Sequence, residues 1–155
     1  MAVLIDPEKA SYSSVKNLVE QSAFNEVDFL FVGGSLVNEE QMKDCMAWIK
    51  ELSSKPTVIF PGSPNQIDEQ ADAILLLSLI SGRNPDLLIG KHVEASQRLD
   101  KSGLEIIPTS YILIDGGRTT TVSYISNTIP IAEDKTDIAV STALAGKQLG
   151  HKLTY

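Results

Sequence analysis

The chain opens with Met1-Ala2-Val3-Leu4-Ile5-Asp6-Pro7, an apolar run that ends in an aspartate and a proline. The apolar run from Met1 to Ile5 predicts a short buried β-strand, because Val and Ile favour extended backbone. Pro7 cannot donate a ladder hydrogen bond, so the strand should stop at Asp6. Asp6 would then lie at the carboxyl end of a strand, the edge where parallel α/β folds bind their ligands.

The rest of the chain alternates between strand-like and helix-like segments. Strands are expected at residues 28–32, 57–60, 73–80 and 105–115, with Pro108 interrupting the last, and a further strand begins at His151. Helices are expected at residues 13–23, 38–52, 85–102 and 134–150. Residues 119–125 are rich in Thr, Val and Tyr and predict a short extra β segment. This order predicts one α/β domain, residues 1–155, with a parallel sheet.

One connection is too short for the alternating pattern. Only residues 64–72 separate the strands expected at 57–60 and 73–80. A helical crossover between parallel strands normally needs a dozen or more residues. We therefore expect no full helix here, and one helical turn at most.

Composition excludes several classes of function. The 155 residues carry a formal net charge of −7, and nucleic-acid binding needs a basic face, so we expect no nucleic-acid partner. Cys45 is the single cysteine, which excludes an intramolecular disulfide and fits a cytoplasmic protein. No apolar run approaches the ~20 residues of a transmembrane helix.

The ends of the sequence are abrupt. The chain opens directly on a core strand, and residues 152–155 predict the beginning of another. A complete eight-stranded α/β barrel needs about 250 residues, whereas this chain supplies about six strands. We therefore expect a piece of a longer protein.

Two neighbouring strands end in residues that suit a metal ion. Asp6 follows the first strand, and Gly33-Gly34-Ser35 follows the second. Sequential strands are usually neighbours, so Asp6 and Ser35 should face the same volume. Magnesium (Mg2+) prefers such oxygen ligands together with water and substrate phosphate. The alternatives are that Asp6 bonds to its own loop and that the glycines only form a tight strand-to-helix turn.

A third strand end carries a cation. Arg83 follows the strand expected at 73–80 and precedes the helix that starts at Pro85. An arginine beside a helix N-terminus suits an anion, although a solvated loop arginine is the alternative. Lys9 and Lys91 are expected to be surface residues.

Other chemistries lack their sequence patterns. His92 and His151 have no Cys or His partners at zinc-ligand spacing, and Cys45 lies on a buried helix stripe. The chain contains no nucleophile elbow and no Gly-Lys-Ser/Thr phosphate loop.

Five motifs in order resemble one known family. They are Leu4-Ile5-Asp6-Pro7-Glu8-Lys9, Phe31-Val32-Gly33-Gly34-Ser35, Phe60-Pro61-Gly62-Ser63, Ser81-Gly82-Arg83-Asn84-Pro85, and Ser126-Asn127-Thr128 through Asp134-Lys135. Together they resemble the geranylgeranylglyceryl phosphate synthase family with its heptaprenylglyceryl relatives. The details are similar to the subgroup of some archaea and Bacteroidetes-type bacteria.

The resemblance implies a TIM barrel whose third helix is replaced by an extended segment. It also implies magnesium-dependent transfer of a long prenyl group from prenyl diphosphate to the 3-hydroxyl of sn-glycerol 1-phosphate. Asp6 and Ser35 would hold the magnesium ion. Substrate contacts are expected at Gly33, Gly34, Pro61, Gly62, Ser63, Arg83 and Tyr155, and Phe60, Pro61 and Ile67 would line part of the tail channel.

The sequence also departs from the family pattern. The other subgroup has a lysine two residues before the aspartate, where this chain has Leu4, so no lysine role is carried over. In the family, Tyr155 would begin a glycerol phosphate motif that contains the expected base. The resemblance therefore assigns no catalytic base within residues 1–155, and we expect this piece alone to be inactive.

Two alternatives remain open from the sequence. The chain could belong to another phosphate-binding barrel enzyme, because such enzymes share glycine-ended strands. It could also be a non-catalytic partial barrel that associates through open strand edges. Trp48 and an open strand edge favour a homo-oligomer.

Overall fold

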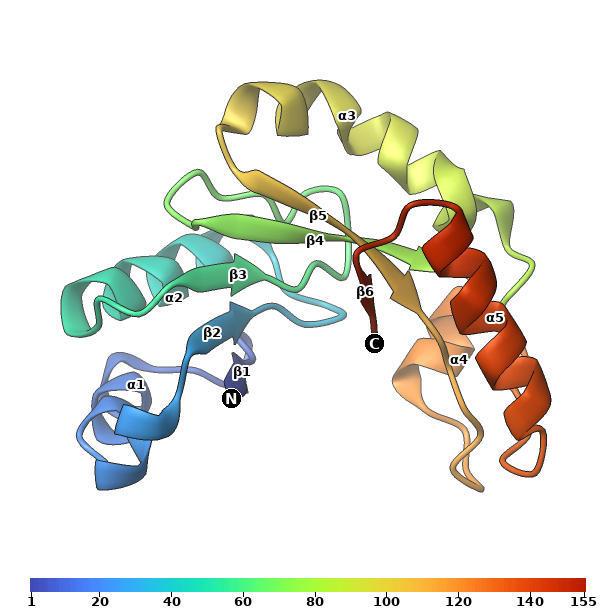
Figure 1. The fold of residues 1–155 in the computed structure, drawn as a ribbon. Helices are drawn as coiled ribbons and strands as arrows, with labels where there is room; N and C mark the ends of the chain where they lie inside the picture. The colour runs from blue at the N-terminus through green and yellow to red at the C-terminus, as the bar shows by residue number, and fades with distance from the viewer. The chain divides into compact units, whose positions relative to one another are not determined.

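The computed structural model describes residues 1–155 and contains one six-stranded sheet, in the order β1-β2-β3-β4-β5-β6 (Figure 1). The strands are β1 (Ala2–Ile5), β2 (Phe29–Val32), β3 (Thr57–Ile59), β4 (Ala73–Leu79), β5 (Glu105–Tyr111) and β6 (Leu153–Thr154). The helices are α1 (Tyr12–Val19), α2 (Glu39–Leu52), α3 (Lys91–Ser102), α4 (Thr121–Ser126) and α5 (Thr136–Gln148). The predicted alternating α/β fold with a parallel sheet is confirmed.

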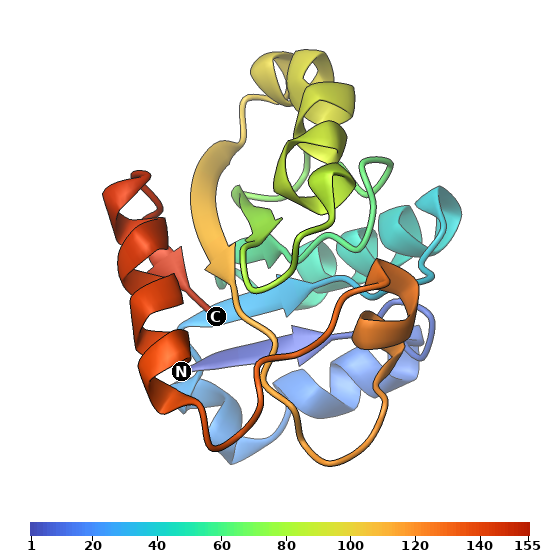
Figure 2. The same ribbon diagram turned by 90° about the vertical axis from the view of Figure 1, so that its right-hand side faces the viewer.

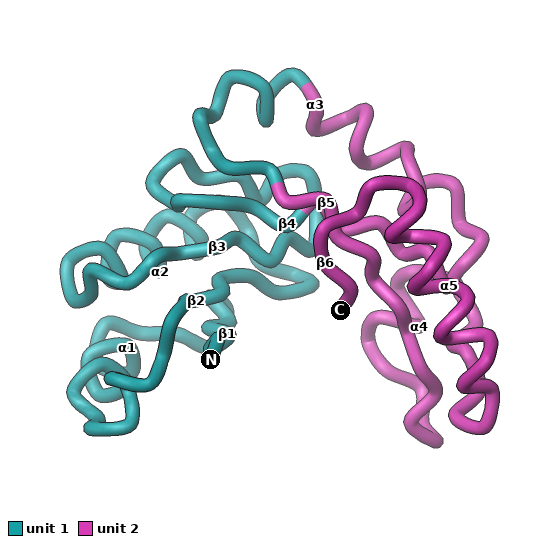
Figure 3. The backbone as a smooth tube through the Cα atoms, in the orientation of Figure 1, with its two compact units in different colours: residues 1–75, 97–106 teal, residues 76–96, 107–155 magenta.

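The chain divides into two compact units, and β4, α3 and β5 each pass from one to the other (Figure 3). The first unit comprises residues 1–75 and 97–106, and the second comprises residues 76–96 and 107–155. None of the helices has the length and hydrophobicity to cross a bilayer.

The core of the first unit lies between its strands and α2. Met42, Cys45, Met46 and Ile49 form a fully buried stripe at the helical spacing of three and four residues. Leu30 of β2 and Ile59 of β3 are also fully buried in this unit. Asn38 begins α2 with a reciprocal capping box, since its side chain accepts from the Gln41 N–H and its own N–H donates to the Gln41 side chain. Each large side chain buried here contributes about 1.5–3 kcal/mol.

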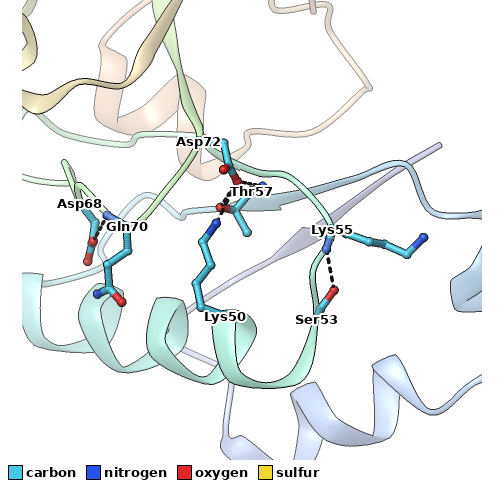
Figure 4. Close-up of polar contacts among 7 residues, drawn as sticks. All are labelled: Lys50, Ser53, Lys55, Thr57, Asp68, Gln70 and Asp72. Atoms are coloured by element: carbon cyan, nitrogen blue, oxygen red, sulfur yellow. Dashed lines mark hydrogen bonds and ion pairs between the residues drawn. The ribbon is translucent and has the colours of Figure 1, made fainter.

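Residues 64–72 contain turns and no helix, which confirms the predicted short connection. The connection ends at Asp72, whose carboxylate oxygen Oδ2 accepts from the Thr57 N–H at 2.7 Å and from the Thr57 hydroxyl at 2.9 Å. The Lys50 ammonium group reaches the same oxygen at 2.9 Å (Figure 4). Asp72 therefore holds the start of β3 against α2 and β4.

The Asp72 contacts predict an acid-sensitive stabilisation. The hydrogen bond from the Thr57 backbone, opposed by burial and reinforced by Lys50, holds the pKa of Asp72 below its ordinary value of 3.8. A carboxyl with a depressed folded pKa stabilises the fold above its unfolded pKa, and this contribution disappears as the pH falls through the folded value. We expect Asp72→Asn to lower the free energy of unfolding by about 1 kcal/mol at pH 7 and to have little effect at pH 2. Urea unfolding of the variant and of a Glu69→Gln control at both pH values tests this, and equal losses at the two pH values would contradict it.

In the second unit, α5 packs beside β6 (Figure 1 and Figure 2). Gly146 of α5 permits a close approach to β5 as well, because a Cβ there would lie 1.9 Å from the Ser110 hydroxyl oxygen on β5. The same hydroxyl bonds Nδ1 of His151 at 2.7 Å. The predicted strand after His151 is confirmed as β6, in parallel register with β5.

A second serine–histidine pair lies in the same unit. The Ser78 hydroxyl of β4 lies 3.1 Å from Nε2 of His92 on α3. Burial, followed by the neighbouring His151, lowers the pKa of His92 from its ordinary 6.5. The unfolded chain therefore binds a proton at His92 more readily than the folded chain does. The neutral, buried histidine contributes its full stabilisation above pH 6.5, and this contribution is lost as the pH falls below that value.

This histidine predicts a decline of stability in mild acid. We expect the free energy of unfolding to fall between pH 7.5 and pH 5, and His92→Gln to flatten that decline because Gln does not titrate. Chemical unfolding at several pH values measures both slopes. An unchanged slope in His92→Gln would assign the decline to other groups.

The structure corrects three predicted elements. Residues 119–125 are not a β segment: Thr120 caps α4 through a reciprocal box with Ser123, and this local bonding outweighs the β propensity of Thr and Val. Pro108 does not interrupt β5. Its carbonyl accepts from the Lys152 N–H, just before β6 begins at Leu153, so no strand residue lies where an N–H of residue 108 would need an acceptor. The first helix ends at Val19, and a 3-10 turn at Ser22–Glu26 buries Phe24 instead.

Candidate functional site

The first unit brings Asp6 against the glycine-rich end of β2. β1 and β2 are parallel neighbours with Ile5 opposite Val32, and the Gly33 N–H extends the ladder to the Ile5 carbonyl at 3.1 Å. A Cβ placed on Gly34 would lie 2.8 Å from Oδ1 of Asp6, so the carboxylate lies directly against this loop. The predicted meeting of these two strand ends is confirmed.

Both oxygens of Asp6 have partners within its own loop. Oδ1 accepts from the Glu8 N–H at 3.1 Å, and Oδ2 lies 3.0 Å from the Lys9 ammonium nitrogen. The hydrogen bond and charge of Asp6 raise the pKa of Lys9. Lys9 is exposed as expected, but the sequence analysis missed its contact with the candidate metal ligand. Its spacing three residues after Asp6 was the available signal.

Two glycines let the ends of β2 and β3 approach each other. A Cβ on Gly33 would lie 1.9 Å from the Phe60 carbonyl oxygen, and a Cβ on Gly62 would lie 2.4 Å from the Gly34 carbonyl oxygen. Ser35 is exposed and Ser63 is half-buried beside them. No hydrogen bond within the chain uses the backbone N–H groups of Gly34 and Ser35. The Gly33–Ser35 loop therefore presents two amide donors and no bulky side chain.

Gln66 joins these loops and was missed by the sequence analysis. Its amide oxygen accepts from the Gly62 N–H at 2.8 Å. Its amide nitrogen donates to the Gly34 carbonyl at 2.9 Å and to the Val37 carbonyl at 3.1 Å. Only 1% of Gln66 is exposed. A glutamine in a polar turn gives no sequence signal that it is buried, so only the structure could identify it.

The second unit gathers the two remaining motifs. The Asn84 side chain donates to the Ser126 carbonyl at 2.7 Å, and a Cβ on Gly82 would lie 2.5 Å from the Thr128 side chain. The Arg83 guanidinium donates to the Gly82 carbonyl at 2.8 Å and lines an open, largely apolar groove of about 530 Å³ against α5. Tyr155 packs edge-on against Tyr111, with ring centroids 5.4 Å apart.

Cys45 is excluded as a surface nucleophile. It is completely buried on the α2 stripe, as predicted. Burial, with a smaller contribution from the charge of Asp6, raises the pKa of its thiol to about 11. A thiol with that pKa is protonated at neutral pH and is a poor nucleophile.

The residue types at the ends of β1 and β2 are ones that a hard cation binds. Asp6 offers a carboxylate, Ser35 offers an exposed hydroxyl, and the Lys9 side chain that pairs with Asp6 is 80% exposed and can move away. No cluster of three or more His, Cys, Asp or Glu side chains could hold a metal in the structure. An ion here would take its other ligands from water and from the phosphate of a substrate, as magnesium commonly does.

The chain is similar to several known proteins. It is 53% identical over 154 residues to the geranylgeranylglyceryl phosphate synthase of Chitinophaga pinensis, and 54% identical over 154 residues to that of Spirosoma linguale. The alignments cover 99% of this chain but 61% and 62% of those relatives, so the chain spans about three-fifths of their length.

A solved structure has the same fold. The geranylgeranylglyceryl phosphate synthase of Thermoplasma acidophilum, in complex with its substrate sn-glycerol-1-phosphate, superposes with a TM-score of 0.90 and 31% identity. The match covers 99% of this chain and 62% of that one, which confirms the predicted barrel-type α/β fold class. The PcrB family pattern matches residues 1–155. The chain therefore belongs to the PcrB family.

Proposed function

We propose that this chain is part of a magnesium-dependent prenyltransferase. The reaction is a step of ether lipid synthesis. Prenyl diphosphate donates a long prenyl group, and sn-glycerol 1-phosphate accepts it. The observation that carries the proposal is the Asp6 carboxylate lying against the Gly33–Ser35 loop at the carboxyl ends of adjacent parallel strands. The names of the relatives support the same reaction class.

The first unit would bind the diphosphate. Asp6 and Ser35 would hold the magnesium ion, and the uncommitted N–H groups of Gly34 and Ser35 would donate to phosphate oxygens. Gly33 and Gly62 lack side chains that would keep a ligand away from the backbone. When bound, magnesium neutralises the charge that develops on the departing diphosphate.

The remaining predicted contacts serve the two substrates differently. Phe60 and Pro61 are half-buried and suit an apolar tail, and the Phe60 ring lies 6.3 Å from that of Phe31. Ile67 is buried in the core with 5% exposure, so its contact with a tail stays a prediction. Arg83 would supply a cation for a phosphate, and Tyr155 would contribute to the acceptor side.

A transfer assay tests the proposal. The protein that carries this chain is incubated with radiolabelled prenyl diphosphate, sn-glycerol 1-phosphate and magnesium, and lipid-soluble product is counted. We expect product that depends on both substrates and is lost when EDTA removes the metal. If no product forms with prenyl diphosphates of any chain length, the proposed prenyltransferase activity is wrong. If the yield of product is the same in EDTA, the proposed dependence on magnesium is wrong.

We also propose that copies of the chain associate in the cytoplasm. Trp48 is half-buried on α2, so part of its ring is exposed to solvent or to another copy of the chain. The single cysteine is buried and unpaired, which suits a reducing compartment. Light scattering tests the association, and a monomer at micromolar concentration would contradict it.

A further inference from the structure

Gln66 is a buried polar side chain whose role the reaction chemistry does not explain. It lies in the short connection that replaces a helical crossover, and its amide contacts both of the loops assigned to diphosphate. We propose that Gln66 is a positioning residue that orients the Gly33–Ser35 loop so that the Ser35 N–H faces the diphosphate. This inference rests on the proposed function, because it assigns the ligand of that loop.

The chemistry of the side chain matches the three groups that it meets. The Gly62 N–H requires an acceptor, whereas the Gly34 and Val37 carbonyls each require a donor. A primary amide supplies one acceptor and two donors at the end of a single side chain. Glutamate has the same length but no donor when ionised, and methionine supplies no donor and only a weak acceptor.

The geometry of the peptide unit turns these bonds into an orientation. In a trans peptide the carbonyl of one residue and the N–H of the next point in opposite directions. The Gly34 carbonyl is fixed on Gln66, and the chain has no cis peptide bonds, so the Ser35 N–H must point away from Gln66. That N–H has no acceptor in the chain and remains available to an anion.

The two residues that flank Gln66 share a side-chain partner of their own. The Arg98 guanidinium of α3 donates to the Ile67 carbonyl at 2.7 Å and reaches the Asn65 carbonyl at 3.5 Å. Arg98 therefore fixes the residues before and after Gln66. Because this connection has no helix to satisfy its backbone, these side-chain bonds are what make it a rigid support for the Gly33–Ser35 loop.

Magnesium with inorganic diphosphate is the probe for this role, because it presents the ligand head group without the tail. We expect Gln66→Met to bind it at least about tenfold more weakly than the unmodified protein by calorimetry, since misplacing a binding group by about 1 Å has effects of this size or larger. Gln70→Met is the matched control in the same connection: Gln70 is exposed and should bind within about twofold. In the transfer assay the loss should appear in the KM for prenyl diphosphate and not in that for glycerol phosphate.

Each outcome separates this role from the proposed function. Equal diphosphate affinities in Gln66→Met and the unmodified protein would overturn the positioning role and leave the prenyltransferase proposal intact. Failure of the unmodified protein to bind diphosphate would overturn both. If Gln66→Met does not fold, amide hydrogen exchange of the unmodified protein decides: the Ser35 amide should become protected when diphosphate binds. An unchanged rate would overturn the positioning role and the Ser35 amide contact, while diphosphate binding and prenyl transfer would stand.

Discussion

Asp6→Asn should reduce magnesium-dependent prenyl transfer at least about a hundredfold, while leaving the fold intact. The variant keeps an oxygen for the Glu8 N–H but loses the negative charge that a hard divalent cation requires. It also loses its ion pair with Lys9, but that side chain is exposed and solvent screens the pair, so the stability of the fold should change little. Initial rates across a magnesium titration, together with urea unfolding, measure the two effects separately.

Glu8→Gln is the matched control for that experiment. Glu8 is exposed, and only its backbone N–H contacts Asp6, so the same carboxylate-to-amide change there should leave transfer within about twofold. Retained activity in Asp6→Asn would remove Asp6 from the metal role. A loss that higher magnesium concentrations restore would instead support weakened metal affinity.

Gly33→Ala should destabilise the first unit severely. A Cβ at Gly33 would lie 1.9 Å from the Phe60 carbonyl oxygen and 2.7 Å from its carbonyl carbon. These are backbone atoms of the neighbouring strand end, so relief requires β2 and β3 to separate. Their ladder continues through the Phe60 N–H to the Val32 carbonyl at 2.8 Å, and that separation would break it. We expect a loss of about 3 kcal/mol or more in the free energy of unfolding.

Gly116→Ala provides the comparison. Nothing lies within 4 Å of a Cβ at Gly116, so the same added methyl group should change stability by less than about 0.5 kcal/mol. Thermal and urea unfolding of both variants test the difference. If Gly33→Ala were as stable as Gly116→Ala, the close approach of the two loops would be wrong, and with it the geometry assigned to the diphosphate.

The strand ends were predictable because their signals are local. The apolar run before Asp6, the glycines after Val32 and the short connection after Ser63 each identify an element or its boundary without distant partners. Parallel strands that follow one another in sequence are usually neighbours, and this rule predicted that Asp6 would lie near the loop that follows Val32. The helix stripe of α2 was predictable for the same reason, since its apolar spacing matches the helical period.

The errors arose where local bonding or neighbouring strands outweighed residue preference. Thr120 and Ser123 cap α4 reciprocally, although Thr and Val favour strands elsewhere. Pro108 is tolerated inside β5 because of where β6 begins, which is a property of another strand. Neither outcome depends on composition.

The alternation of strands and helices, the missing crossover and the position of Asp6 at a strand end were all predictable, because each follows from spacing along the chain. The burial of Gln66, the pairing of Lys9 with Asp6 and the bonds from Arg98 to the connection became visible only in the folded chain. The bonds of Gln66 and Arg98 join residues that are 29 to 33 positions apart in the sequence. The Lys9–Asp6 pair depends on the conformation of the flexible lysine side chain. A polar residue in a turn has the same sequence pattern whether it is solvated or supports a binding loop, and only packing separates the two.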